Sequence, residues 1–96
     1  MTFDELSRVI DEYFEHRKMR KPNSKDAALF LASEVGEFID ALMRDENGWV
    51  RNNQKDCDVA FELADCLFMV LVCARALGID PVTVLLQKMQ KKMVDS

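Results

Sequence analysis

Histidine and cysteine are scarce in this chain of 96 residues, which contains one histidine and three cysteines. A lone His16 and cysteines without the CxxC spacing lend little support to a zinc site. Cys66 and Cys73 are seven residues apart, so they share one face of a helix, where thiols pack as small hydrophobic groups. An odd number of cysteines without a disulfide pattern favours a reducing compartment, and we expect a cytoplasmic protein.

Long apolar runs and an excess of positive charge are also missing. The longest apolar run, residues 66–74, has nine residues and is too short to cross a bilayer. The first ten residues, MTFDELSRVI, are polar and amphipathic, unlike a secretory signal. The formal net charge of −4 argues against a protein that coats nucleic acid. We therefore expect no membrane partner and no stable nucleic-acid partner.

What the chain does contain is typical of a helix-rich globular protein. Hydrophobic residues make up 49% of the sequence and charged residues 31%. The length fits one domain over residues 1–96, with a core that is only modestly stabilising. A chain so short and so apolar is expected to bury further surface against copies of itself, as a homodimer or homotetramer.

Four helices and no strands are expected, which makes the fold class an all-α four-helix bundle. The expected helices cover residues 3–18, 24–44, 57–77 and 81–93, with a loop over 45–56. Thr2 and Glu5 have the spacing of a capping box, and Ser24 is the expected N-cap of the second helix. Gly78 ends the third helix, and Asp80, followed by proline, caps the fourth.

Two pairs of carboxylates are the most informative feature of the sequence. Glu34 and Glu37, then Glu62 and Asp65, each have i, i+3 spacing, which places both members on one face of a helix. At about 100° per residue, Glu34 falls in the middle of the apolar arc of its helix and Glu37 at the edge of that arc. Within residues 60–74, Glu62 and Asp65 are the only polar side chains, which predicts a central core helix.

Such acid pairs are also common on solvated helix faces, and the spacing alone does not decide between the two interpretations. The apolar surroundings favour an inward direction, where an ionised carboxylate needs a counter-charge. Oxygen ligands suit hard divalent cations such as Mg²⁺, with Mn²⁺ as an alternative. The sequence therefore predicts a divalent-metal site between two helices.

The same residues resemble a known family signature. The stretch 34–37 (EVGE), twenty-four intervening residues, then 62–65 (ELAD) resembles the ExxE…ExxD signature of the MazG-like all-α nucleoside triphosphate pyrophosphohydrolases. The stretch 76–89, ALGIDPVTVLLQKM, is similar to the closing segment of that family. In all, the resemblance covers residues from about 24 to 92.

This resemblance implies a four-helix core that forms dimers or tetramers and hydrolyses a (d)NTP to the (d)NMP and pyrophosphate. It implies Mg²⁺ held by four acids, which are Glu34, Glu37, Glu62 and Asp65. An acid that is not fully engaged by metal can accept a proton from the attacking water. Because Glu37 lies at the wetter edge of its arc, it is the candidate general base.

Four further residues are candidates for contact with the substrate. Lys88 is supported by the family match, and Lys92 stands where relatives often carry an asparagine. Lys25 falls in the first turn of a helix, whose N-terminus favours anions. Lysine side chains are also commonly solvated without any binding role, and this alternative stays open for all three lysines. Trp49 either stacks on a nucleobase or covers the core or an oligomer contact.

The expected function is Mg²⁺-dependent removal of non-standard or surplus deoxynucleotides, such as dCTP or dATP. One alternative is a non-catalytic helical interaction module whose acids form ion pairs with Arg44, Arg51 or Arg75. Another is an enzyme like phosphoribosyl-ATP pyrophosphatase, which acts on a biosynthetic intermediate.

Overall fold

The chain folds into four helices and no strands over the part that the computed structural model describes, residues 1–47 and 59–95. Side chains are described for 1–44 and 59–95. The helices are α1 (Phe3–His16), α2 (Ser24–Asn47), α3 (Val59–Leu77) and α4 (Pro81–Asp95). The predicted all-α fold class with four helices is confirmed.

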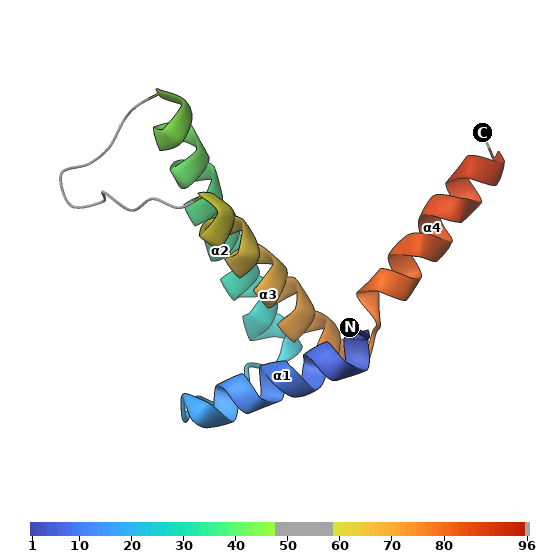
Figure 1. Ribbon diagram of the computed structural model, residues 1–96, viewed down its shortest axis with the longest axis horizontal. Helices are drawn as coiled ribbons and strands as arrows, with labels where there is room; N and C mark the ends of the chain where they lie inside the picture. The colour runs from blue at the N-terminus through green and yellow to red at the C-terminus, as the bar shows by residue number, and fades with distance from the viewer. Residues whose placement is uncertain (48–58, 96) are drawn as a thin grey trace.

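Helices α2 and α3 form an antiparallel pair, and α1 crosses the end of this pair where α2 begins and α3 ends (Figure 1). The small core lies at this crossing. Ile10 and Phe14 of α1 pack there with Ala27 of α2 and with Met69 and Val72 of α3. Helices α2 and α3 also pack directly against each other along their length, and α1 closes one end of the pair.

The helix ends largely follow the predicted signals, with one correction at α2. Thr2 and Glu5 form the expected capping box at the start of α1. The N-cap of α2 is Asn23 and not Ser24, because the Asp26 amide donates to Asn23 Oδ1 at 2.8 Å. Ser24 is already the first residue inside the helix.

Three other predicted boundaries also differ from the structure, one of them at the end of α4, which reaches Asp95 and not residue 93. Helix α1 ends at His16, before the expected residue 18, because Lys18 adopts a positive φ of 54°. Helix α2 continues through residues 45–47, which were assigned to the loop. An ion pair between Arg44 and Asp40, one turn apart, supports its last turns. The predicted loop from residue 48, and the predicted helical positions Cys57 and Asp58, lie outside the described residues.

The turn between α3 and α4 is built by the residues that the sequence indicated. Gly78 has a φ of 70°, and the Ile79 amide donates to the Ala74 carbonyl at 2.9 Å. The Asp80 carboxylate accepts from the amides of Val82 and Thr83 at 3.0 and 3.2 Å. This capped turn sends α4 away from α3 at a bend of 96°.

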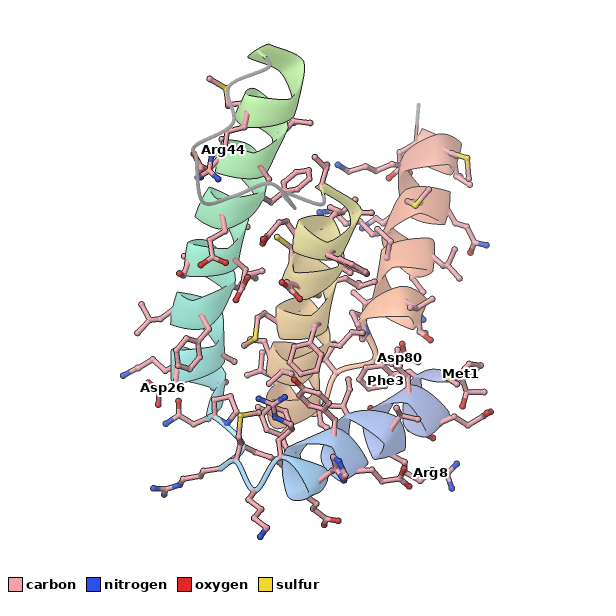
Figure 2. The ribbon with its side chains drawn as sticks, turned by 60° about the vertical axis from the view of Figure 1, so that its left-hand side comes forward. Met1, Phe3, Arg8, Asp26, Arg44 and Asp80 are labelled. Carbon is pink, nitrogen blue, oxygen red and sulfur yellow. The ribbon has the colours of Figure 1, made fainter. Side chains whose placement is uncertain are left out.

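As a result, α4 projects from the other helices and buries none of its residues (Figure 1). Asp80, at its start, lies close to Phe3 at the start of α1 (Figure 2). The α3 helix is also more open than the sequence predicted. Leu63 and Leu67 are 54% and 59% exposed, because α1 and α2 cover only part of its circumference. Its place as a central core helix is therefore not borne out within the single chain.

No single helix among residues 1–47 and 59–95 is long and apolar enough to span a bilayer. Only α3 and α4 taken together reach the required length and composition, and the sharp bend separates them.

Candidate divalent-cation site

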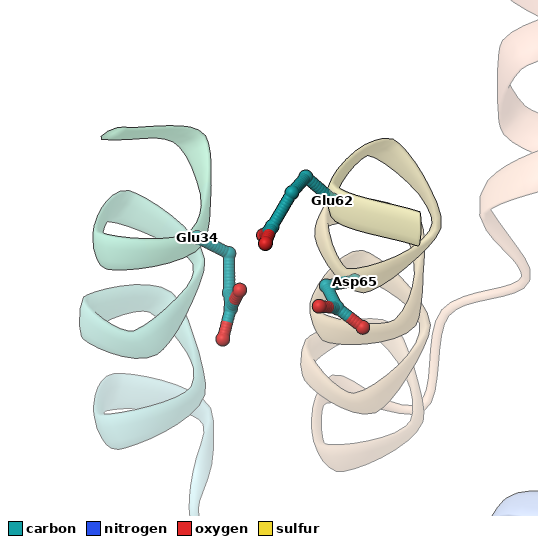
Figure 3. Close-up of side chains that lie close together, drawn as sticks. All are labelled: Glu34, Glu62 and Asp65. Carbon is teal, nitrogen blue, oxygen red and sulfur yellow. The ribbon is translucent and has the colours of Figure 1, made fainter. Parts of the chain in front are cut away.

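Three carboxylates converge between the two long helices, from the middle of α2 and from the first two turns of α3 (Figure 3). Glu34 comes from α2, and Glu62 and Asp65 come from α3. One oxygen of each lies within 4.8 Å of the others. The i, i+3 spacing puts Glu62 and Asp65 on one side of α3, and the antiparallel packing brings Glu34 opposite them. We call these three residues the acid cluster.

Two carboxylates of this cluster are partly buried without a compensating partner. Glu34 and Glu62 are half-buried, and Oε2 of each is buried without a hydrogen-bond partner in the described structure. A buried carboxylate oxygen without a partner costs free energy, which a bound cation or a proton removes. Asp65 is exposed, so it is the member of the cluster that solvent reaches most easily. Three carboxylates at this separation fit a hard divalent cation, which prefers oxygen ligands.

The pKa of Glu34 also shows that negative charge in the cluster is not compensated. Burial raises the pKa of Glu34 from 4.5 to about 7, helped by a hydrogen bond with the Glu37 side chain. The charges of Glu37, Asp65 and Glu62 act in the same direction. The pKa of the Cys66 thiol is also raised, by burial and then by these acids. Negative charge is therefore concentrated here without a compensating cationic side chain among the described residues.

Glu37 stands apart from the three converging acids. Its side chain is exposed and reaches Glu34 through their shared hydrogen bond. This exposure agrees with its predicted place at the edge of the apolar arc. The three oxygens within 4.8 Å of one another do not include one from Glu37. Its position suits a group that acts next to a cation as well as one that binds it.

Two of the three arginines named in the non-catalytic alternative, Arg44 and Arg75, have partners outside the acid cluster. Arg44 pairs with Asp40 on its own helix, and Arg75 pairs with Asp11 of α1. Arg51 lies outside the described residues. An ion-pair network between the acid cluster and these arginines therefore has no support in the described structure.

The candidate substrate residues do not gather at the acid cluster within one chain. Lys25 is exposed in the first turn of α2, nine residues before Glu34, which is about 14 Å along the helix axis. Lys88 and Lys92 are exposed on the projecting α4. Trp49 lies outside the described residues.

Two features of the site region were not identified from the sequence. Cys66, expected as a plain core residue, is half-buried next to the acids, and its spacing of four from Glu62 was the available signal. The second feature is an ionic group that joins α1 to the end of α3, in which Asp11 accepts from both Lys21 and Arg75. Asp11 and Arg75 are 64 positions apart in the sequence, so no local sequence pattern predicts this ionic group.

An all-α fold with three carboxylates converging between antiparallel helices defines a candidate divalent-cation centre. Comparison with known families identifies the class of protein that carries it. The model of the MazG nucleotide pyrophosphohydrolase domain matches residues 22–95, a range that contains α2, α3 and α4. The chain therefore belongs to the MazG nucleotide pyrophosphohydrolase family. No curated protein and no solved structure matches the chain.

Membership of this family points to nucleotide pyrophosphohydrolase activity in general, and the family generally depends on divalent metal ions. The matched range includes every residue of the acid cluster and Glu37.

Proposed function

We propose that this protein is a Mg²⁺-dependent pyrophosphohydrolase that converts a (d)NTP to the (d)NMP and pyrophosphate. One observation carries the proposal: Glu34 and Glu62 bury carboxylate oxygens without partners and converge with Asp65. A nucleoside triphosphate is a polyanion, which this acidic centre repels unless a cation lies between the two. The family match supplies the reaction class.

In this proposal, Glu34, Glu62 and Asp65 hold the cation, and Glu37 completes the set. When bound, Mg²⁺ or Mn²⁺ neutralises phosphate oxygens and makes a water molecule more acidic. Because Glu34 and Glu62 are half-buried, the cation that they would hold is fixed between α2 and α3 and is partly shielded from bulk water. Glu37 is the most accessible acid beside them, and its carboxylate accepts the proton of the attacking water.

The substrate side of the proposal follows the chemistry of the remaining candidates. Lys25, Lys88 and Lys92 supply positive charge for the phosphates, and Trp49 supplies an aromatic face for the base. We propose that residues 1–96 act as one domain in the cytoplasm and remove non-standard or surplus deoxynucleotides, dCTP or dATP among them.

The test is an assay of pyrophosphate release from the common ribo- and deoxyribonucleoside triphosphates, with Mg²⁺ and with EDTA. We expect release in Mg²⁺ only, with the deoxynucleotides hydrolysed best. The Glu62→Gln variant should lose activity, and Glu12→Gln, which removes an exposed acid from α1, should keep it. Release of orthophosphate instead of pyrophosphate, or full activity in Glu62→Gln, would contradict the proposal. Phosphoribosyl-ATP is included as a substrate, because hydrolysis of it alone would favour the biosynthetic alternative.

A further inference from the structure

A pocket of about 440 Å³ lies where the start of α1 meets the turn between α3 and α4. Phe3 of α1 and Asp80 of the turn both line it, and they lie close together in Figure 2. Arg75, which also lines it, follows Asp65 by ten residues, which is about 15 Å along α3. This pocket, which we call the end pocket, is therefore separate from the acid cluster and has the size of a small-molecule site.

The end pocket is lined by charged side chains of both signs, and two of them have no ion-pair partner. Asp4 and Arg8 come from α1, one turn apart, at a spacing that permits an ion pair between them. All ion pairs among the side chains of residues 1–44 and 59–95 run to Asp11 or Asp40. Asp4 and Arg8 are thus unpaired in this part of the chain, and both are exposed. Their charges are available to a molecule in the pocket.

The other two charged residues of the pocket, Arg75 and Asp80, are held in place by their own hydrogen bonds. Arg75 donates to Asp11 through Nε, at 2.6 Å, and through one terminal nitrogen, so its other terminal nitrogen keeps its donors. The Asp80 carboxylate accepts from the amides of Val82 and Thr83 and keeps its negative charge. Side chains that are fixed before binding lose little freedom when a ligand arrives.

A buried hydroxyl group in the wall of the pocket lacks a partner. Ser7 lines the pocket and is 5% exposed, and its Oγ makes no hydrogen bond in the described structure. Buried hydroxyl groups are nearly always hydrogen-bonded, because leaving one without a partner costs free energy. Ser7 comes three residues after Asp4, so the two lie on neighbouring turns of one face of α1. A polar ligand on this face can supply the missing partner.

We propose that the end pocket binds a small zwitterion of the α-amino acid type. Two arginines and two aspartates line it, so a ligand with one charge of each sign matches them. Arg8 and Arg75 bind the carboxylate through charge-assisted hydrogen bonds, and the Ser7 hydroxyl donates to the same group. Asp4 and Asp80 bind the ammonium group.

The remaining wall of the pocket narrows the class of ligand. Phe3 and Ile79 add apolar surface, so an amino acid with a small apolar side chain, such as valine, suits the pocket. A nucleoside triphosphate brings an excess of negative charge, which the two aspartates repel, so the end pocket is not a second place for the substrate. A bound amino acid joins α1 to the turn that directs α4, and it stabilises the folded chain by mass action.

Nuclear magnetic resonance of the ¹⁵N-labelled protein tests the proposal without metal, nucleotide or activity. We expect L-valine to shift the amide signals of residues 3–8 and 75–80 in a saturable way, with a dissociation constant in the millimolar range. Isovalerate, which lacks the ammonium group, and isobutylamine, which lacks the carboxylate, should each bind at least about tenfold more weakly. No saturable shift with L-valine up to about 50 mM, or equal binding of isovalerate, would overturn the inference.

Arg8→Gln should weaken the binding of L-valine at least about tenfold. Arg17→Gln, which removes the same charge at the other end of α1, should bind as the wild type does. Full binding by Arg8→Gln, or an equal loss in both variants, would contradict a site at the end pocket.

Ser7→Ala separates binding from a merely structural role. The variant loses a hydroxyl group that has no partner in the free protein, so its Tm without ligand should be equal to that of the wild type or higher. Its affinity for L-valine should nevertheless fall. A lower Tm with unchanged affinity would contradict the contact of Ser7 with the ligand. Pyrophosphate release is not needed for any of these measurements, so they stand apart from the test of the proposed function.

Discussion

Glu34 has the most unusual environment of any carboxylate in the described structure, and its titration has a measurable consequence. Its pKa is raised from 4.5 to about 7, chiefly by burial. A carboxyl group with a higher pKa in the folded state binds more protons when folded, so stability falls as pH rises between those two values. In EDTA, we expect the free energy of unfolding to decrease from about pH 4.5 to pH 7 and to level off above.

Urea unfolding monitored by circular dichroism across this pH range measures the effect. The Glu34→Gln variant should lose most of the decrease, because its amide does not ionise, and it should be the more stable protein at pH 8 without metal. Glu12→Gln serves as the matched control on α1. A wild type whose metal-free stability is constant over the window would show that Glu34 is not held protonated.

Glu37 offers a way to separate proton transfer from cation binding. Its carboxylate is exposed and lies outside the three converging acids. If it accepts the proton of the attacking water, Glu37→Gln should lower kcat by about a hundredfold or more. The stabilisation of the fold by Mg²⁺, measured as the rise in Tm, should remain mostly intact. A Glu37→Gln variant that also loses the rise in Tm would identify this residue as a principal ligand instead.

The acids illustrate what the sequence could reveal at this scale. The helical wheel correctly placed Glu34 inside the apolar arc and Glu37 at its edge, because both positions depend only on the 3.6-residue period. The exposure of Asp65 was not foreseen. It depends on how much of α3 its neighbours cover, and this is a tertiary property that the apolar composition of the helix does not reveal.

At the scale of the helices, two glycines have opposite roles that one substitution can distinguish. Gly78 adopts a φ of 70°, which an alanine tolerates poorly. Gly36 lies inside α2, and a methyl group there would meet no atom within 4 Å apart from its chain neighbours and the nearby backbone of its own helix. We therefore expect Gly78→Ala to destabilise the fold by about 1 kcal/mol and Gly36→Ala to stabilise it by about the same amount.

Urea denaturation of the two variants beside the wild type gives these differences directly. Because both changes add one methyl group, the comparison controls for size and hydrophobicity. Equal effects of the same sign would contradict the assigned backbone conformations. Gly78 lies in the turn that directs α4. The loss of stability in Gly78→Ala therefore also measures how strongly the fold favours the conformation of this turn.

Helix boundaries that depend on hydrogen bonds between near neighbours in the sequence were predicted better than the others. The capping box at Thr2 and Glu5 and the cap at Asp80 were predicted because their hydrogen bonds join residues within three positions. The start of α2 was assigned to Ser24, although Asn23 caps it. Two adjacent residues with good capping side chains compete there, and propensity alone does not separate them.

For the whole molecule, the period of the apolar residues predicted four helices, and it did not predict how they are arranged. The sequence pattern indicates which side of each helix is apolar, and it does not reveal whether that side is covered by the same chain. Hence the bundle was expected around a central α3, whereas α4 projects and α3 remains half open. The ion pairs of Asp11 with Lys21 and Arg75, which fix α1 across the pair, likewise depend on tertiary contact.

The proposed activity depends on the acid cluster holding a divalent cation. The most direct test is calorimetric titration of the metal-free protein with Mn²⁺ and Mg²⁺, without nucleotide, for the wild type, Glu62→Gln and Glu12→Gln. We predict saturable binding to the wild type and to Glu12→Gln, and affinity at least about tenfold weaker in Glu62→Gln. Equal binding to all three proteins, or none to the wild type, would contradict a divalent-cation site at the acid cluster.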